Sequence, residues 1–150
     1  MSQTLTKLTV HVVFSTKNRR DMITSNVAEE LHAYIGGICR GHDSPLLAVG
    51  GTANHLHLLI SLSKNIALSE LMLNVKRDSS VWIKSKGAMF HDFYWQDGYA
   101  AFSVSESQMA AVVDYIAHQD EKHRTKTFEE ELVAFAERHD VAFDPRYLLS

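Results

Sequence analysis

The stretch from His55 to Leu62 constrains the fold more than any other part of the chain. It is mostly apolar, and it follows a second apolar run, Pro45 to Val49, across a turn that contains Gly50 and Gly51. A glycine pair supplies the positive φ angles that a tight turn needs, so the two runs predict a β-hairpin. Because apolar residues occupy successive positions from Leu56 onward, we expect this strand to lie in the centre of a sheet.

The flanking sequence predicts further strands and helices. Segments rich in β-branched and aromatic residues predict strands at Leu5 to Thr16 and at Tyr99 to Val104. Apolar residues at helical spacing predict helices at Thr24 to Ile38, at Ile66 to Lys86, from Ser105 onward (where Ser105 to Gln108 match a capping box), and at Thr127 to His139. The order β-α-β-β-α-β followed by helices predicts an α+β protein, a ferredoxin-like sandwich with an antiparallel sheet and additional C-terminal helices.

Length and composition indicate a single domain spanning residues 1–150. A chain of this length builds one core, and 45% hydrophobic and 22% charged residues are close to average globular usage. No apolar stretch approaches the roughly 20 residues that cross a bilayer, and the first residues lack a signal-peptide pattern, so we expect a cytoplasmic protein. Cys39 is the only cysteine, which excludes an internal disulfide and a zinc site built on several thiolates.

The charge is unevenly distributed. The net charge of -3 argues against a surface that is basic throughout, yet residues 1–104 carry ten Lys and Arg against eight Asp and Glu. Two basic clusters are candidate nucleic-acid-binding sites: Lys17, Arg19 and Arg20, and then Lys76, Arg77, Lys84 and Lys86. Each is explained equally well as a phosphate-binding patch or as solvated surface. Trp82, within the second cluster, either stacks on bases of single-stranded DNA or belongs to the core.

The histidines at positions 55 and 57 are candidate metal ligands. Alternate side chains of a strand share a face, so His55 and His57 point the same way and form half of a metal site. Two polar rings in a central apolar strand also need partners. With nine histidines in 150 residues, such a pair also arises by chance, and a hydrogen-bonded pair without metal is the alternative.

Tyr115 and Gln119 are four residues apart on the predicted third helix, so both address the same site, one turn apart. An amide oxygen beside two imidazoles suits Mg²⁺ or Mn²⁺ better than zinc, and it leaves coordination positions open for a phosphate. Tyr115 taken alone is also explained as an amphipathic residue at the rim of the core.

Segments spread over nearly the whole chain resemble the single-tyrosine transposases of the insertion-sequence-200 type, which belong to the HUH nucleases. The resemblance rests on the His55-Leu-His57 strand, on Trp95 to Ser105, on Tyr115-Ile-Ala-His-Gln119, and also on His11 to Lys17 and Lys76 to Ser80.

This resemblance implies a domain that cleaves and rejoins single-stranded DNA and recognises hairpins near the ends of a mobile element. It implies a divalent cation held by His55, His57 and Gln119, and it makes Tyr115 the nucleophile of a 5′-phosphotyrosine intermediate. It further implies a homodimer, in which the tyrosine helix can serve the partner's cation site.

Other assignments remain open from the sequence. His118 and Asp120 flank Gln119 and are alternative ligands. A domesticated DNA-binding regulator would keep the fold and hairpin binding without transposing. A metal-dependent hydrolase would use the histidine pair to activate water, with Tyr115 in a structural role and without a covalent intermediate.

Overall fold

A four-stranded antiparallel sheet forms the centre of the computed structural model, which describes residues 2–122 and 126–144. The strand order is β2-β3-β1-β4. The strands are β1 (Thr9–Ser15), β2 (Leu46–Gly51), β3 (His55–Ser61) and β4 (Ala100–Ser103). The strand that carries the histidine pair, β3, is therefore internal, as the sequence predicts.

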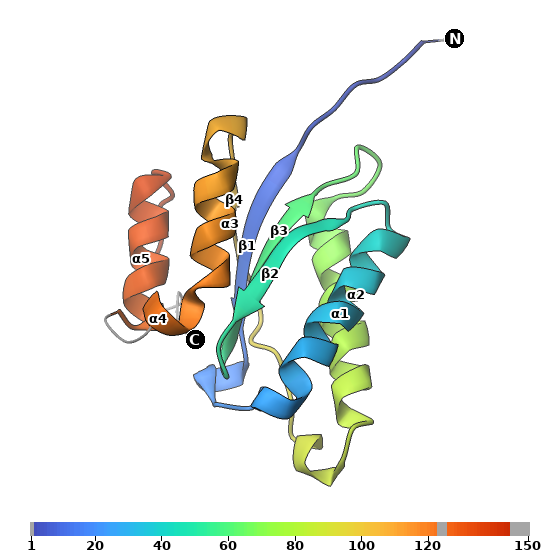
Figure 1. Ribbon diagram of the computed structural model, residues 1–150, viewed down its shortest axis with the longest axis vertical. Coiled ribbons are helices and arrows are strands. Elements are labelled where there is room, and N and C mark those ends of the chain that lie inside the picture. Colours follow the sequence, from blue (N-terminus) through green and yellow to red (C-terminus); the bar gives the residue numbers. More distant parts are fainter. Residues whose placement is uncertain (1, 123–125, 145–150) are drawn as a thin grey trace.

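Helices cover both faces of this sheet (Figure 1). Two long helices, α1 (Ser25–Gly41) and α2 (Leu68–Lys84), lie on one face. The C-terminal helices lie on the other: α3 (Met109–Ala117), α4 (Gln119–Lys122) and α5 (Phe128–Arg138). This arrangement confirms the predicted α+β sandwich with additional C-terminal helices.

Alternation along β3 separates its side chains between the two helical layers. Leu56, Leu58 and Ile60 belong to the main hydrophobic core, which also contains the buried residues of α1 and α2. His55 and His57 occupy the alternate positions and face the C-terminal helices. One strand therefore contributes to the core with one face and to a polar cluster with the other.

Gly50 acts through its missing side chain and not through its φ angle. Among the described residues the glycines with positive φ are Gly87 and Gly98, so the expected positive φ angles at Gly50 and Gly51 are wrong. A Cβ at Gly50 would lie 2.3 Å from the main-chain oxygen of Ile116. Glycine at this position therefore allows α3 to pack directly against β2.

The predicted third helix is interrupted. Its first residues form a short 3-10 turn, Glu106–Gln108, and the Ser105 hydroxyl pairs with Ser107 at 3.1 Å, so the expected capping box does not form. The α-helix ends at Ala117, and His118 has the non-helical angles φ −115° and ψ 36°. Because the break falls between them, Tyr115 and Gln119 lie on different helices, α3 and α4.

The other elements agree with the sequence to within four residues at each end. Two further 3-10 turns connect them, Lys17–Arg19 and Ala88–Phe90. Over residues 2–122 and 126–144, no helix is both long and apolar enough to cross a membrane.

Candidate active site

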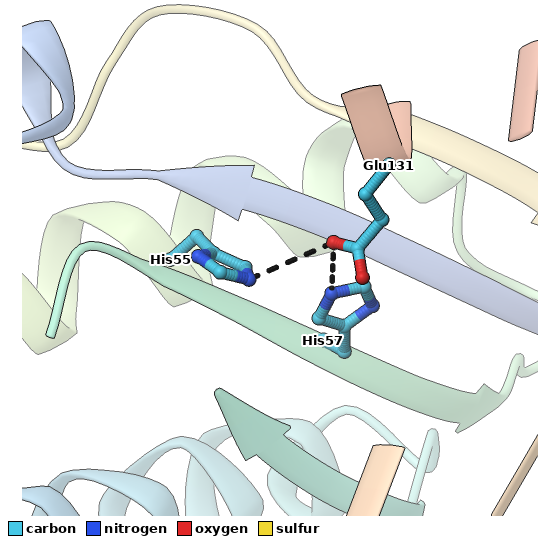
Figure 2. A group of neighbouring side chains, drawn as sticks. All are labelled: His55, His57 and Glu131. Carbon is cyan, nitrogen blue, oxygen red and sulfur yellow. Dashed lines mark hydrogen bonds and ion pairs between the residues drawn. The ribbon is translucent and has the colours of Figure 1, made fainter. Parts of the chain in front are cut away.

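The two histidines of β3 form the floor of a buried polar cluster (Figure 2). His55 and His57 have no exposed surface, and their ring centroids are 5.3 Å apart. Both direct Nε2 toward a carboxylate that comes from the C-terminal layer. The shared face that strand alternation predicts is therefore present.

Glu131 of α5 is this carboxylate. Its Oε1 lies 2.9 Å from Nε2 of His57 and 3.6 Å from Nε2 of His55, and the residue is 1% exposed. The side-chain donor atoms of the three residues lie within 4.8 Å of one another, a grouping that can hold a metal ion.

Glu131 is not among the site residues that the sequence predicts, so its place in the site was missed. The sequence does contain a signal for this role, which is the spacing of Glu131 from the apolar residues of the same helix. Phe128, Leu132 and Ala136 form the buried stripe of α5, and position 131 falls on the same face. A carboxylate on the apolar face of an amphipathic helix needs a buried partner, which marks it as a candidate site residue.

Tyr115 and Gln119 reach the same cluster despite the break between α3 and α4. The Tyr115 hydroxyl donates a hydrogen bond to Oε2 of Glu131, and its ring lies edge-on to His57 with centroids 5.7 Å apart. Oε1 of Gln119 lies 3.2 Å from Nε2 of His55, and its Nε2 donates to the main-chain oxygen of Tyr115. The four residues that the sequence predicts for the catalytic centre therefore lie together in one cluster of a single chain: His55, His57, Tyr115 and Gln119.

The two alternative ligands beside Gln119 lie outside this cluster. His118 is about half exposed, and its Nδ1 lies 2.8 Å from the main-chain oxygen of Asp114 and 3.3 Å from the Asp114 carboxylate. Asp120 is exposed. The helix break directs both side chains away while Gln119 turns inward.

The ionisation of the cluster follows from its burial and its contacts. Burial raises the pKa of Glu131, but the hydrogen bond and charge of His57, the hydrogen bond from Tyr115 and the charge of His55 outweigh it, lowering the pKa to about 2. Burial, and then the hydrogen bond to Glu131 and its charge, raise the pKa of Tyr115 well above its usual value. At neutral pH the cluster therefore holds an ionised carboxylate beside a neutral phenol.

These residues fit a divalent cation. Two ligand atoms at right angles around an ion, each about 2.1 Å from it, are about 3.0 Å apart. Here Oε1 of Glu131 lies 2.9 Å from Nε2 of His57 and 3.6 Å from Nε2 of His55, and Oε1 of Gln119 lies 3.2 Å from Nε2 of His55. The donors are two imidazole nitrogens, an ionised carboxylate and an amide oxygen, a set that Mg²⁺ or Mn²⁺ accepts.

The first basic cluster adjoins this site. Arg19 forms an ion pair with Glu129 of α5, and its main-chain oxygen accepts a hydrogen bond at 3.3 Å from Asn54, the residue before the first site histidine. Lys17 and Arg20 are exposed. Their charges are therefore available to solvent near the histidine end of β3.

The second basic cluster lies on the opposite face of the sheet, with Lys76, Arg77 and Lys84 on α2 and Lys86 just after it. The Lys76 ammonium donates to the main-chain oxygens of Gln96, at 2.8 Å, and Gly98, and burial lowers its pKa. Lys76 and Arg77 also line a cleft of about 450 Å³ with Trp95 and Tyr99. Lys76 thus anchors the loop before β4, in addition to any contact with a ligand.

The remaining basic residues of this cluster lie at the end of α2 and just after it. Lys84 lies over the ring of Tyr94, with Nζ 4.0 Å from the ring centroid, and Lys86 lies 4.8 Å from the ring of Trp82. Trp82 stacks on Tyr34 with centroids 5.1 Å apart and packs against the edge of the core while partly exposed. Basic and aromatic side chains are interleaved here, with Trp82 partly in contact with the core and partly exposed.

The fold and the cluster together describe an α+β protein with a candidate divalent-cation site beside a tyrosine. Comparison with known proteins gives the family. Residues 4–119 match the family described as "Transposase IS200 like", which covers most of the chain. The chain therefore belongs to the IS200-like transposases, a family of DNA-processing enzymes. Glu131 lies beyond the matched residues.

Known relatives agree with this membership. The transposase for insertion sequence element IS200 of Salmonella typhimurium is 24% identical over 119 residues, covering 76% of this chain and 78% of the relative. The ISDra2 transposase TnpA of Deinococcus radiodurans is 22% identical over 121 residues, covering 77% and 86%.

A solved structure shares the fold. It is a REP-associated tyrosine transposase bound to a REP hairpin, with a TM-score of 0.62 and 18% identity, covering 97% of this chain and 92% of that one. At this identity the likeness establishes the architecture of the sheet and its helices.

Proposed function

We propose that this protein cleaves and rejoins single-stranded DNA at the ends of a mobile element, as a single-tyrosine transposase of the HUH type. In this proposal Tyr115 is the nucleophile that forms a 5′-phosphotyrosine intermediate. His55, His57 and Gln119 hold a Mg²⁺ or Mn²⁺ ion, and Glu131 contributes a carboxylate to the same site.

One observation carries the proposal. The Tyr115 hydroxyl is hydrogen-bonded to the carboxylate that also contacts His57 and faces His55. A nucleophile must be held within a few ångströms of the groups that activate its target, and here a single side chain joins the two. This contact favours a catalytic role for Tyr115 over a purely structural one.

The cation, when bound, supplies positive charge that offsets the charge developing on the phosphate oxygens. Tyr115 and Glu131 carry out the bond exchange and the proton transfer. The Tyr115 hydroxyl gives its proton to Glu131 Oε2 as its oxygen bonds to phosphorus and the bond from phosphorus to the 3′-oxygen breaks. Solvent then carries a proton from Glu131 to the departing 3′-oxygen, which leaves as a 3′-hydroxyl and returns Glu131 to its ionised state.

The covalent link preserves the energy needed for rejoining. A phenol is a better leaving group than an alcohol, so a DNA 3′-hydroxyl can attack the phosphotyrosine, release Tyr115 and restore a phosphodiester without ATP. The same cluster therefore serves both cleavage and joining.

Two features support single-stranded DNA with hairpins as the substrate. A relative of the same fold is described as bound to a REP hairpin. The cleft beside Lys76 and Arg77 brings cations next to the exposed ring of Tyr99, a combination that binds single strands by stacking and charge. Lys17, Arg19 and Arg20 lie nearer the cation site and would contact the backbone there.

A homodimer remains part of the proposal. Because Tyr115 meets Glu131 and His57 of its own chain, one subunit is sufficient to build each site, and exchange of the tyrosine helix is not required.

The decisive experiment looks for a protein–DNA adduct. Hairpin-containing single-stranded oligonucleotides are incubated with the protein and Mn²⁺, and denaturing gels reveal any covalent product. We expect an adduct with the unchanged protein and with Tyr34→Phe, a control tyrosine on α1, and none with Tyr115→Phe. His57→Ala or excess chelator should abolish cleavage while hairpin binding persists.

Three outcomes would contradict the proposal. An adduct that persists in Tyr115→Phe would exclude this tyrosine as the nucleophile. Metal-dependent cleavage without any adduct would instead support a hydrolase that activates water, and hairpin binding without cleavage would support a regulator.

A further inference from the structure

A third histidine, His11 of β1, lies directly behind the site. It is 2% exposed, and its Nε2 is 2.8 Å from Nδ1 of His57. In the pairing of β1 with β3, Val13 lies opposite His57, so His11 is two residues away on the same face of the sheet. The proposed reaction does not use this side chain.

The contact matters because a neutral imidazole has two ring nitrogens, of which only one carries a proton. If Nε2 of His57 offers its lone pair to a cation, the ring proton must be on Nδ1. A buried N–H then needs an acceptor, and the acceptor determines which tautomer the ring adopts.

The other site histidine meets this requirement with oxygen atoms. Nδ1 of His55 lies 2.8 Å from Oδ1 of Asn54 and 2.9 Å from Oγ1 of Thr52, both in the turn of the hairpin. His57 is two residues farther along β3, where the partner of its Nδ1 is a side chain of the neighbouring strand, His11.

We infer that His11 is a positioning residue of the cation site: its Nε2 accepts the Nδ1–H of His57 and so holds the Nε2 lone pair of His57 toward the cation. This inference rests on the cation site of the proposed function. It adds a residue from β1 that touches neither cation nor DNA and acts only through His57.

The surroundings of His11 suit this task. Its ring packs edge-on against Phe135 of α5, with centroids 5.0 Å apart, and tilts against His57 at the same distance. The ring is therefore fixed between β1 and α5.

The test is the affinity of the DNA-free protein for Mn²⁺, measured by isothermal titration calorimetry. His11→Phe keeps a ring against Phe135 but removes the acceptor, and we expect affinity to fall by about 10- to 100-fold, as for other partners of metal-binding histidines. His11→Gln places an amide oxygen near the position of Nε2 and should recover much of the loss. His91→Phe, at an exposed histidine, is the matched control.

A second measurement reads the tautomer directly. Nitrogen-15 spectra of the Mg²⁺-loaded protein should show the His57 ring protonated at Nδ1, and a mixture of tautomers in His11→Phe. This readout and His11→Gln keep the inference testable if His11→Phe folds poorly.

The outcomes separate this inference from the proposed function. If the unchanged protein does not bind Mn²⁺, the cation site and the role of His11 both fail. If it binds Mn²⁺ and His11→Phe binds equally well, or if His57 is protonated at Nε2 in the loaded protein, the inference about His11 alone is overturned.

Discussion

The two faces of the sheet are built from the same strands but are stabilised by different interactions. Toward α1 and α2, the strands present Val12, Phe14, Leu56, Leu58 and Ile60, all buried in an apolar core. Toward α3 and α5, the alternate positions present His11, His55 and His57. His11 pairs with His57, His57 with Glu131, and His55 with Gln119. Strand alternation thus allows a stable core and a polar site to share one backbone.

The helices reflect the same difference. On the core face, α1 and α2 are 17 residues each and bury mainly apolar side chains. On the site face, α3 has nine residues and one buried side chain, Ile116, while α5 has eleven and buries Glu131 among apolar neighbours. Changes on the core face should therefore affect stability first, and changes on the site face should affect chemistry first.

The largest expected effects come from one substitution on each face, Leu58→Ala in the core and Tyr115→Phe in the site. Leu58→Ala should lower the free energy of unfolding by about 2–5 kcal/mol, because it leaves a cavity in the core. Tyr115→Phe should lower that free energy by about 1.5–3 kcal/mol, the contribution of one hydrogen bond to an ionised carboxylate, yet reduce adduct formation on the order of 10³-fold or more.

Denaturant unfolding and single-turnover adduct assays on the folded fraction measure both quantities. A large stability loss in Tyr115→Phe, or a slow adduct step in folded Leu58→Ala, would show that the two faces are not functionally separate.

Acid should lower the free energy of unfolding through the protonation of Glu131 on the site face. Its pKa is lowered from 4.5 to about 2 in the folded protein, so its stabilisation is complete above pH 4.5 and is lost as the pH falls toward 2. We expect this carboxyl to account for about 3 kcal/mol of the lost unfolding free energy.

Unfolding curves of the unchanged protein and of Glu131→Gln, recorded between pH 6 and pH 2, isolate this contribution, with Glu137→Gln on the exposed side of α5 as the control. Parallel pH dependences for the unchanged protein and Glu131→Gln would refute the assignment.

Gly50→Ala should disturb the packing of the site face on the sheet. The added Cβ would meet the main-chain oxygen of Ile116, so α3 must move, at a cost of about 1–3 kcal/mol, and Tyr115 moves with it. Thermal unfolding and the adduct rate should both decline. Gly41→Ala is the control, because a Cβ there meets no atom within 4 Å; equal behaviour of the two variants would exclude close packing at Gly50.

The smallest effect concerns the exposed charges beside the site. Lys17→Gln and Arg20→Gln should change the unfolding free energy by at most about 0.5 kcal/mol. Each should reduce the slope of log affinity against log salt for single-stranded DNA by about 0.7, because one phosphate contact is lost. Fluorescence anisotropy over a salt series measures the slope, with Lys64→Gln as the control; an unchanged slope would remove these residues from the DNA interface.

Local patterns determined much of the fold. The period of two in β3 depends only on strand geometry, so His55 and His57 were certain to share a face once the segment formed a strand. The helical spacing of apolar residues likewise determined α1, α2 and α5, because amphipathic helices bury the same side wherever they pack. Tyr115 was a candidate because its spacing from Gln119 matched a helical turn.

Only the tertiary structure decided which residues complete the cluster. Glu131 meets the histidines because α5 packs across the face of β3, and His11 meets His57 because β1 pairs with β3 in one particular register. Gly50 matters because α3 crosses directly over it. Such contacts join residues far apart in the chain, and local periodicity carries no information about which distant surfaces will meet.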